Sequence, residues 1–372
     1  MNRRSIFIAA TGQNIGKTTL CLGIIAGLSR RYGRVGFLKP VGQQHATIDN
    51  NVKIDKDAVL FKTHFNLPFR LTDMSPVIIP PGFTRDFIDG HFSEKTLLKK
   101  IHSSFQTISQ QNDYTVVEGT GHVGVGSIID LNNAKVAAAL GLDMVIVVSG
   151  GLGSAIDELA LNIAMCERYG VHVRGVILNR VLDHKREMIL DYFPRALKKW
   201  GIPLIGCVPF NVFLNSPALR DFESLFHTTL LSGEEHHYRH FHHFRLVACS
   251  LSAYKEEMTS NELVITPATR TDIIEATLEH AKDSGGMILT GKHPPGEKMI
   301  KRIQSAGVPT LYVPLCSYDA MKMITSYKAK IRIKDHSKIK KAIQVVEDAV
   351  HFDTLCRGND KQELAPDFLK AQ

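Results

Sequence analysis

The chain has 372 residues, which suggests two or three domains at the usual size of roughly 100–200 residues each. Hydrophobic residues make up 44% and charged residues 22%, close to the globular average, which argues against a disordered or fibrous protein. The net charge of +8 favours anionic partners such as nucleotides, without by itself indicating DNA.

The sequence gives no sign of secretion or of a membrane span. Its six cysteines are scattered without a CxxC pair, which argues against a zinc ribbon or a disulfide scaffold and favours a cytoplasmic protein. No apolar run reaches the roughly 18–20 residues that cross a bilayer, so no membrane contact is expected. The apolar run near the N-terminus is too short for a signal peptide and indicates a strand.

A strand, a loop and a helix open the chain. Residues 5–10 form the apolar run of a buried parallel strand, and residues 20–28 predict a helix. Between them, residues 11–19 read Thr-Gly-Gln-Asn-Ile-Gly-Lys-Thr-Thr. This is the context that a phosphate-binding loop requires. Thr11 occupies the place of the usual first glycine, so the loop is a variant.

The chemistry of such a loop assigns roles to its residues. Loop N–H groups and the helix N-terminus point at phosphates. Lys17 would reach the β- and γ-phosphates, and the Thr18 hydroxyl would bind Mg²⁺. The expected nucleotide contacts are Gly12, Gln13, Asn14, Ile15, Gly16, Lys17, Thr18 and Thr19.

Four further charged residues are candidates for the same site. Lys39 ends the second strand, on the ligand side of a parallel sheet, where it would face the γ-phosphate or an anionic substrate; a surface lysine is the alternative. Asp55 and Asp57 are candidate Mg²⁺ ligands, with a helix-cap aspartate as the alternative for each. Glu118 ends a strand at 114–118, and four glycines follow it, so it is expected to bind Mg²⁺ directly or through water.

The alternation of strands and helices continues. Strands are predicted at 144–149, 172–178 and 203–208, with a helix at 154–169. This order predicts an α/β fold with a doubly wound, mostly parallel sheet. Asn179 follows one of these strands, where its amide could read a purine edge.

These motifs together resemble dethiobiotin synthetase and, more closely, the N-terminal region of long-form phosphate acetyltransferases. The shared pieces are Thr11…Gly16-Lys17-Thr18, Leu38-Lys39-Pro40-Val41, Val117-Glu118-Gly119-Thr120-Gly121, Gly175-Val176-Ile177-Leu178-Asn179 and Gly206-Cys207-Val208-Pro209.

The resemblance implies ATP and Mg²⁺ as cofactors. It implies that Lys17 and Lys39 act on the reacting phosphoryl group as catalytic residues. It also implies metal ligands, namely Thr18, Asp57 and Glu118, and an adenine site at Asn179 and Pro209. Residues 118–133 depart from dethiobiotin synthetase, so the identity of the substrate does not carry over.

The second half of the chain indicates another domain. The expected division is a P-loop ATP-binding domain at 1–230, a His-rich linker at 231–245, a smaller α/β domain resembling the DRTGG domain at 246–350, and a polar tail at 351–372. The five histidines between 236 and 243 favour a solvated linker over a metal site, because no Cys or carboxylate cluster accompanies them.

The DRTGG name motif is degraded here to Thr269-Arg270 and Thr290-Gly291-Lys292. Arg270, at a predicted helix start, would bind an anionic effector or pair with a local carboxylate; the sequence leaves both open. Alternating basic residues at 327–334 predict a strand with one solvated face, which we favour over a nucleic-acid surface.

Two functions remain open at this stage. One is an ATP-dependent carbon–nitrogen ligase that activates a carboxylate. The other is a non-catalytic module that senses ATP and a metabolite and acts on a partner, since the chain ends before a separate catalytic domain would fit. The expected partners are a nucleotide and an unidentified small anionic metabolite. Symmetric dimers are common among related P-loop proteins, so a homodimer is the assembly that the resemblance suggests.

Overall fold

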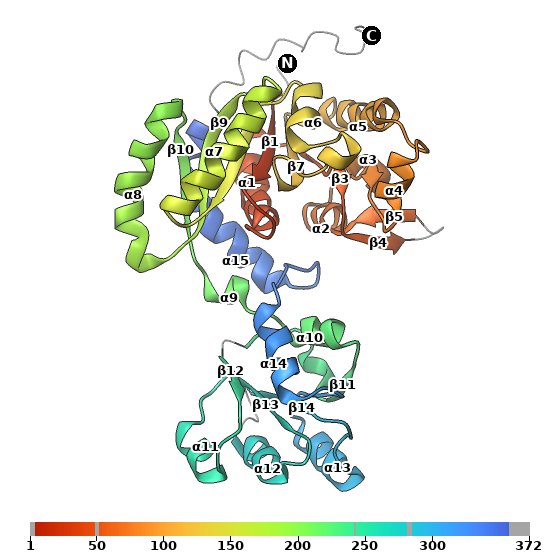
Figure 1. Cartoon of the computed structure of the whole chain (residues 1–372), viewed down its shortest axis with the longest axis vertical. Helices are drawn as coiled ribbons and strands as arrows, with labels where there is room; N and C mark the ends of the chain where they lie inside the picture. Colours follow the sequence, from red (N-terminus) through yellow and green to blue (C-terminus); the bar gives the residue numbers. More distant parts are fainter. Residues whose placement is uncertain (1–3, 49–51, 242, 281–284, 357–372) are drawn as a thin grey trace. The chain divides into compact units, whose positions relative to one another are not determined.

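The computed structural model describes residues 4–48, 52–241, 243–280 and 285–356. These residues form two compact units (Figure 1). Of the described residues, those up to 210 and those from 331 onward form the first unit, and those from 211 to 330 form the second. Along the described ranges, no helix combines the length and apolar character needed to cross a membrane.

The first unit is built on a six-stranded parallel sheet in the order β10-β9-β8-β1-β7-β2. Its strands are β1 (Arg4–Ala10), β2 (Val35–Leu38), β7 (Tyr114–His122), β8 (Met144–Ser149), β9 (Val173–Val181) and β10 (Leu204–Pro209). Their apolar side chains are almost completely buried, as expected when helices cover both faces of a parallel sheet. The predicted doubly wound α/β fold is therefore confirmed.

Helices cross between these strands. They are α1 (Lys17–Tyr32), α5 (Glu94–Ser109), α6 (Asn133–Ala139), α7 (Gly153–Arg168) and α8 (Asp183–Leu197). Because crossover connections are right-handed, the strand order places α1 on one face of the sheet and α5 to α8 on the other. Helix α1 ends at Gly33, whose N–H donates to the Ser29 carbonyl and whose φ of 75° suits glycine.

Short elements surround the carboxyl edge of β2 and β7. They are β3 (Val41–Gly42), β4 (His45–Ile48), β5 (Val52–Asp55), α2 (Lys56–Phe65), α3 (Leu71–Met74), β6 (Val77–Ile78) and α4 (Phe83–Ile88). Strands β3 and β6 pair in parallel, and β4 and β5 form an antiparallel pair. This excursion returns α2 to the sheet, where Phe61 stacks on Phe37 of β2 at 3.9 Å between ring centroids.

The end of the described chain returns to the first unit. Helices α15 (His336–Glu347) and α16 (Phe352–Cys356) add to the face that α1 covers. Two glycines of α1 allow the approach, because a Cβ on Gly23 would overlap Val346 and one on Gly27 would overlap the Phe352 ring. Strand β10 joins this packing, since the His351 N–H donates to the Ile205 carbonyl at 2.8 Å.

The boundary expected at residue 350, between the smaller domain and the polar tail, is therefore wrong. The domain expected at 246–350 and the tail expected from 351 both include residues that pack in the first unit, down to Cys356 of α16. Sequence could not show this, because the contacts join residues more than 300 positions apart along the chain.

The second unit contains a five-stranded mixed sheet in the order β11-β15-β14-β13-β12. The strands are β11 (Leu230–Ser232), β12 (His243–Leu246), β13 (Glu262–Pro267), β14 (Gly286–Thr290) and β15 (Thr310–Val313), and only β11 is antiparallel to its neighbour. The helices are α9 (Val212–Asn215), α10 (Leu219–Phe226), α11 (Leu251–Glu257), α12 (Thr271–His280), α13 (Glu297–Ala306) and α14 (Ser317–Ser326). A hydrophobic cluster covers each face of the sheet.

Two expectations for this half of the chain need correction. The segment 231–245 is no linker, because it supplies parts of β11 and β12 to the sheet, and His237 bonds Glu223 at 2.6 Å. His242 lies outside the described residues. The strand expected at 327–334 does not form, although Lys328, Lys330 and Lys334 in this stretch are exposed.

The close packing of α1 against α15 generates a prediction. Gly23→Ala should lower the free energy of unfolding by about 1–3 kcal/mol, because the new Cβ overlaps the Val346 side chain. The matched control is Gly153→Ala, at a helical glycine with open space around it, which should leave stability unchanged or raise it by up to about 1 kcal/mol. Urea unfolding measures both, and equal effects would contradict the packing.

Candidate functional site

The loop between β1 and α1 has the backbone of a phosphate-binding loop. Asn14 and Gly16 adopt left-handed conformations, with φ of 57° and 100°. Gly16 is the N-cap of α1, and no side chain caps this helix end. The loop therefore directs a helix N-terminus toward any bound anion.

The variant position of the loop has a structural explanation. Thr11 is buried, and its hydroxyl donates to Glu158 of α7 at 3.2 Å. Its N–H donates to the Val147 carbonyl of β8 at 2.9 Å. A threonine in place of the usual glycine thus ties the start of the loop to the neighbouring helix and strand, a contact that sequence did not reveal.

Lys17 is buried at the start of α1, and its ammonium donates to the Gly121 carbonyl of β7 at 2.7 Å. Burial, helped by the positive charge of Lys39, lowers the pKa of Lys17 to about 8. An anionic phosphate at the loop would reverse this electrostatic penalty. The arrangement therefore leaves Lys17 suited to bind phosphate.

A buried ion cluster lies at the carboxyl edge of β2 and β7. The Lys39 ammonium is 2.8 Å from Glu118 Oε1 and 2.9 Å from Asp57 Oδ2. Burial opposes the charge of Lys39, but Asp57 and Glu118 hold its pKa well above the usual range. Burial raises the pKa of Glu118, an effect that Lys39 counteracts. The positive charge of Lys39 thus lies directly against the two carboxylates and offsets their negative charge.

Thr18 connects this cluster to the loop. Its hydroxyl lies 3.3 Å from Asp57 Oδ1 and 3.3 Å from Glu118 Oε1. Glu118 is 1% exposed, and its Oε2 has no hydrogen-bond partner among the described residues. Three oxygen-bearing side chains with an unsatisfied carboxylate oxygen fit the ligand preference of Mg²⁺. The residues present therefore suit the metal that the resemblance implies.

The structure separates the two aspartates of the expected metal site. Asp55 caps α2, since its Oδ1 accepts from the Asp57 N–H at 2.9 Å. Burial raises the pKa of Asp55 to about 7, and Lys39 opposes that rise. Asp57, by contrast, points into the cluster with Thr18 and Lys39.

Asn179 contacts the loop from the end of β9. Its amide N–H donates to the Ile15 carbonyl at 2.7 Å, and its oxygen accepts from the Arg180 N–H at 3.0 Å. The side chain is thus used to hold the loop, and its reading of adenine stays a prediction. Pro209 pairs with Val181 at the same edge of the sheet, so the two expected adenine residues lie on neighbouring strands.

Arg180 is a residue that sequence reasoning missed. It has a φ of 59°, unusual for a residue other than glycine, and burial lowers the pKa of its guanidinium. Arg180 thus adds a cation at the carboxyl end of β9, directly after Asn179.

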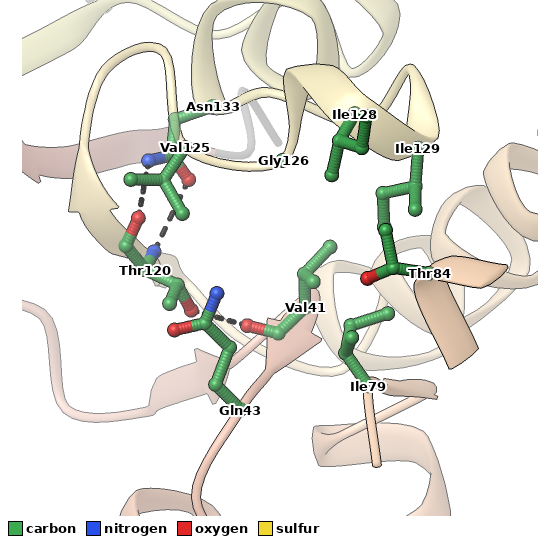
Figure 2. Close-up of a pocket in the computed structure, with 10 residues that line it drawn as sticks. All are labelled: Val41, Gln43, Ile79, Thr84, Thr120, Val125, Gly126, Ile128, Ile129 and Asn133. Atoms are coloured by element: carbon green, nitrogen blue, oxygen red, sulfur yellow. Dashed lines mark hydrogen bonds between the residues drawn. The ribbon is translucent and has the colours of Figure 1, made fainter. Parts of the chain in front are cut away.

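A small pocket opens beside the cluster, with a volume of about 70 Å³ (Figure 2). Thr120 forms one wall, with its hydroxyl bonded to the Val41 carbonyl and its backbone bonded to the Asn133 amide at 2.8 and 3.1 Å. The described lining residues are Val41, Gln43, Ile79, Thr84, Thr120, Val125, Gly126, Ile128, Ile129 and Asn133, none of which is charged. The pocket thus suits an apolar or neutral group.

Arg270 in the second unit is engaged by a local carboxylate. Its guanidinium donates to both oxygens of Asp272 at 2.8 Å and to the Cys249 carbonyl at 3.2 Å. This hydrogen bonding lowers the pKa of Asp272 to about 2. An effector anion at Arg270 would have to compete with Asp272.

The sheet, the loop and the cluster define a P-loop nucleotide-binding protein. The family described as "AAA domain" matches residues 4–218, more than half of the chain, and the chain belongs to this family. A DRTGG domain matches residues 224–327.

Among curated proteins, the phosphate acetyltransferase of Pseudomonas putida is 28% identical over 99% of this chain and 54% of its own length. The ATP-dependent dethiobiotin synthetase BioD of Methanocaldococcus jannaschii is 29% identical over 55% of this chain and 92% of its own length. The chain thus spans about half the length of the phosphate acetyltransferases that it matches. These relatives confirm the resemblance drawn from the motifs.

Among solved structures, the MinC:MinD cell division protein complex of Aquifex aeolicus is 17% identical, with a TM-score of 0.34, over 56% of this chain and 82% of that one.

The contact between Asn179 and the loop generates a prediction. Asn179→Ala should weaken binding of a fluorescent ATP analogue by about tenfold, because the Ile15 carbonyl loses its donor and the loop loosens. Asn112→Ala is the matched control, since this buried amide makes an equivalent 2.7 Å bond to the Ile108 carbonyl away from the loop. It should cost similar stability without changing nucleotide affinity; equal affinities for both variants would contradict the assignment.

The raised pKa of Asp55 predicts a dependence of stability on pH. A carboxyl group whose pKa is raised on folding contributes stability below about pH 4, and this contribution is lost as the pH rises to about 7. Asp55→Asn keeps a capping oxygen but cannot ionise. Relative to the unmodified chain, the variant should therefore be more stable at pH 8 than at pH 5, by about 1–3 kcal/mol.

Urea unfolding in metal-free buffer at the two pH values measures this difference. The control Asp86→Asn, on the exposed surface of α4, should show no such change between the two values. A constant difference between the Asp55 variant and the unmodified chain would contradict the prediction.

Proposed function

We propose that the first unit binds Mg-ATP at the loop and transfers the γ-phosphoryl group to a small carboxylate or carbamate held beside Lys39. The observation that carries the proposal is the convergence of Lys17, Thr18, Lys39, Asp57 and Glu118 on one edge of the sheet. The names of the relatives, an ATP-dependent synthetase among them, support it.

The position of each side chain suggests its role in this transfer. Lys17 and the N-terminus of α1 bind the phosphates, and Arg180 adds positive charge at the carboxyl end of β9. Thr18, Asp57 and Glu118 would hold Mg²⁺, which neutralises phosphate charge when bound. Lys39 orients the acceptor and stabilises the charge that develops on the transferred group.

The proposed reaction has two steps, each a nucleophilic displacement. An oxygen of the carboxylate or carbamate attacks the γ-phosphorus, the bond to the β,γ-bridging oxygen breaks, and ADP leaves with that electron pair. An amine then attacks the acyl carbon, releasing phosphate and a proton. Positioning and charge neutralisation supply most of the rate in such transfers.

The pocket gives a place for the rest of the acceptor. It begins two residues beyond Lys39 and two residues beyond Glu118, at Val41 and Thr120. Because its lining is uncharged, we infer an acceptor whose remote part is apolar or neutral.

The second candidate function is a regulatory module that binds ATP and a metabolite without turnover. The specific observation in its favour is that the similarity to phosphate acetyltransferases runs over both units of the chain, whereas the similarity to BioD covers 55% of it. A shared second unit points to a role beyond that of a synthetase alone.

ADP release from Mg-ATP tests the proposal and separates the two candidates. The purified chain is assayed alone and with a panel of short carboxylic acids and amines. Stimulation by one compound supports the transferase, and tight ATP binding without stimulated turnover supports the regulatory module.

Lys17→Ala provides the prediction for this assay. It should weaken ATP binding by about tenfold or more and remove any stimulated turnover, because the phosphates lose their buried cation. Lys53→Ala, at an exposed position of β5, is the matched control and should retain both activities. Unchanged ATP binding by the Lys17 variant would overturn the proposed function.

A further inference from the structure

The buried ion cluster contains its own cation. The Lys39 ammonium contacts Glu118 Oε1, the same oxygen that lies 3.3 Å from the Thr18 hydroxyl. It also contacts Asp57, whose other oxygen faces Thr18. Lys39 is 4% exposed, so these contacts take place away from bulk water. The lysine thus occupies oxygens that a metal ion at this site would use.

A lysine ammonium and a divalent metal ion compete when both bind the same carboxylate oxygens. Two positive centres within a few ångströms repel, and burial weakens the screening of that repulsion. Removing the ammonium without a replacement would leave the buried Glu118 and the half-buried Asp57 as two like charges close together, which is costly. The cluster therefore needs one cation at all times, and Lys39 supplies it from within the chain.

We propose that Lys39 is an internal competitor for divalent cations, so that the chain binds a metal ion tightly only together with a nucleotide. The inference rests on the metal site of the proposed function and concerns the order in which its ligands enter. A triphosphate at the loop offers Lys39 new anionic partners. The lysine then leaves Asp57 and Glu118 to the metal, and metal and nucleotide strengthen each other's binding.

Binding of Mn²⁺ in the absence of nucleotide tests the proposal directly. Mn²⁺ serves as the probe because free and bound ions are distinguished by electron paramagnetic resonance. The unmodified chain should bind Mn²⁺ weakly alone and at least about tenfold more tightly with a non-hydrolysable ATP analogue.

Lys39→Met removes the internal cation at similar side-chain length. It should bind Mn²⁺ without nucleotide about tenfold or more tightly than the unmodified chain, because two carboxylates then face an uncompensated site. Adding Glu118→Gln to this variant should abolish the gain, which localises the ion to the cluster. If Lys39→Met does not fold, Lys39→Gln removes the charge and keeps an N–H donor.

Lys56→Met is the matched control. Lys56 precedes Asp57 in sequence and is exposed at the start of α2, so the change removes one positive charge near the site without freeing the carboxylates. Its effect on Mn²⁺ affinity should stay below about twofold.

The possible outcomes separate this inference from the proposed function. If the Lys39 variants bind Mn²⁺ no more tightly than the unmodified chain, while the ATP analogue still promotes Mn²⁺ binding, competition by Lys39 is refuted and the metal site stands. Tight binding by the unmodified chain without nucleotide refutes it equally. If no form binds Mn²⁺ even with the analogue, the inference and the proposed metal site both fail.

Discussion

The candidate nucleotide site of the first unit depends on one constraint: the charges of its ion cluster must compensate one another. Lys39, Asp57 and Glu118 come from three separate segments, and each would be costly to bury alone. The chain can therefore adopt its fold here only if β2, α2 and β7 meet at one edge. The irregular register of β7 against β1 after Glu118 makes room for this meeting, since the pairing passes from Ile8↔Glu118 to Ala10↔His122.

The segments around the ion cluster are arranged so that β2, α2 and β7 converge at this edge of the sheet. The excursion from β3 to α4 carries the chain away from Lys39 and back past Asp55, whose cap fixes the start of α2 and thereby the position of Asp57. Beyond Glu118, the hydrogen bonds of Thr120 with Val41 and Asn133 shape the pocket wall (Figure 2). The ion cluster and the uncharged pocket are thus neighbouring parts of one strand edge, with a sharp change of polarity between them.

Sequence predicted the features that are local. Apolar runs and glycines indicate the strand, loop and helix at the N-terminus. The strand predicted at 144–149 is likewise present, as Met144–Ser149. The motifs also indicated that Lys39, Asp57 and Glu118 share a site, and the structure brings them within hydrogen-bonding distance. Their roles toward ligands stay predictions.

What sequence missed depends on partners far along the chain. Glu158 bonds Thr11 across 147 residues, and nothing near either residue marks the pair. The basic stretch near residue 330 looked like a strand because its charges alternate, yet no strand forms there, although Lys328, Lys330 and Lys334 are exposed. The histidines near residue 240 looked like a linker because polar composition does not show that a segment supplies sheet strands.

The return of α15 and α16 to the face covered by α1 also bears on how the chain folds during its synthesis. The P-loop helix emerges from the ribosome early, but its packing partners follow only after the whole second unit has been made. Contacts of such large sequence separation form slowly, since a long loop must close first. The second unit can thus fold while the first still lacks a covering layer over part of its sheet. The nascent chain would expose that apolar surface for the time needed to translate more than 300 residues. Chaperone binding would be most useful during this period, because exposed apolar surface promotes aggregation.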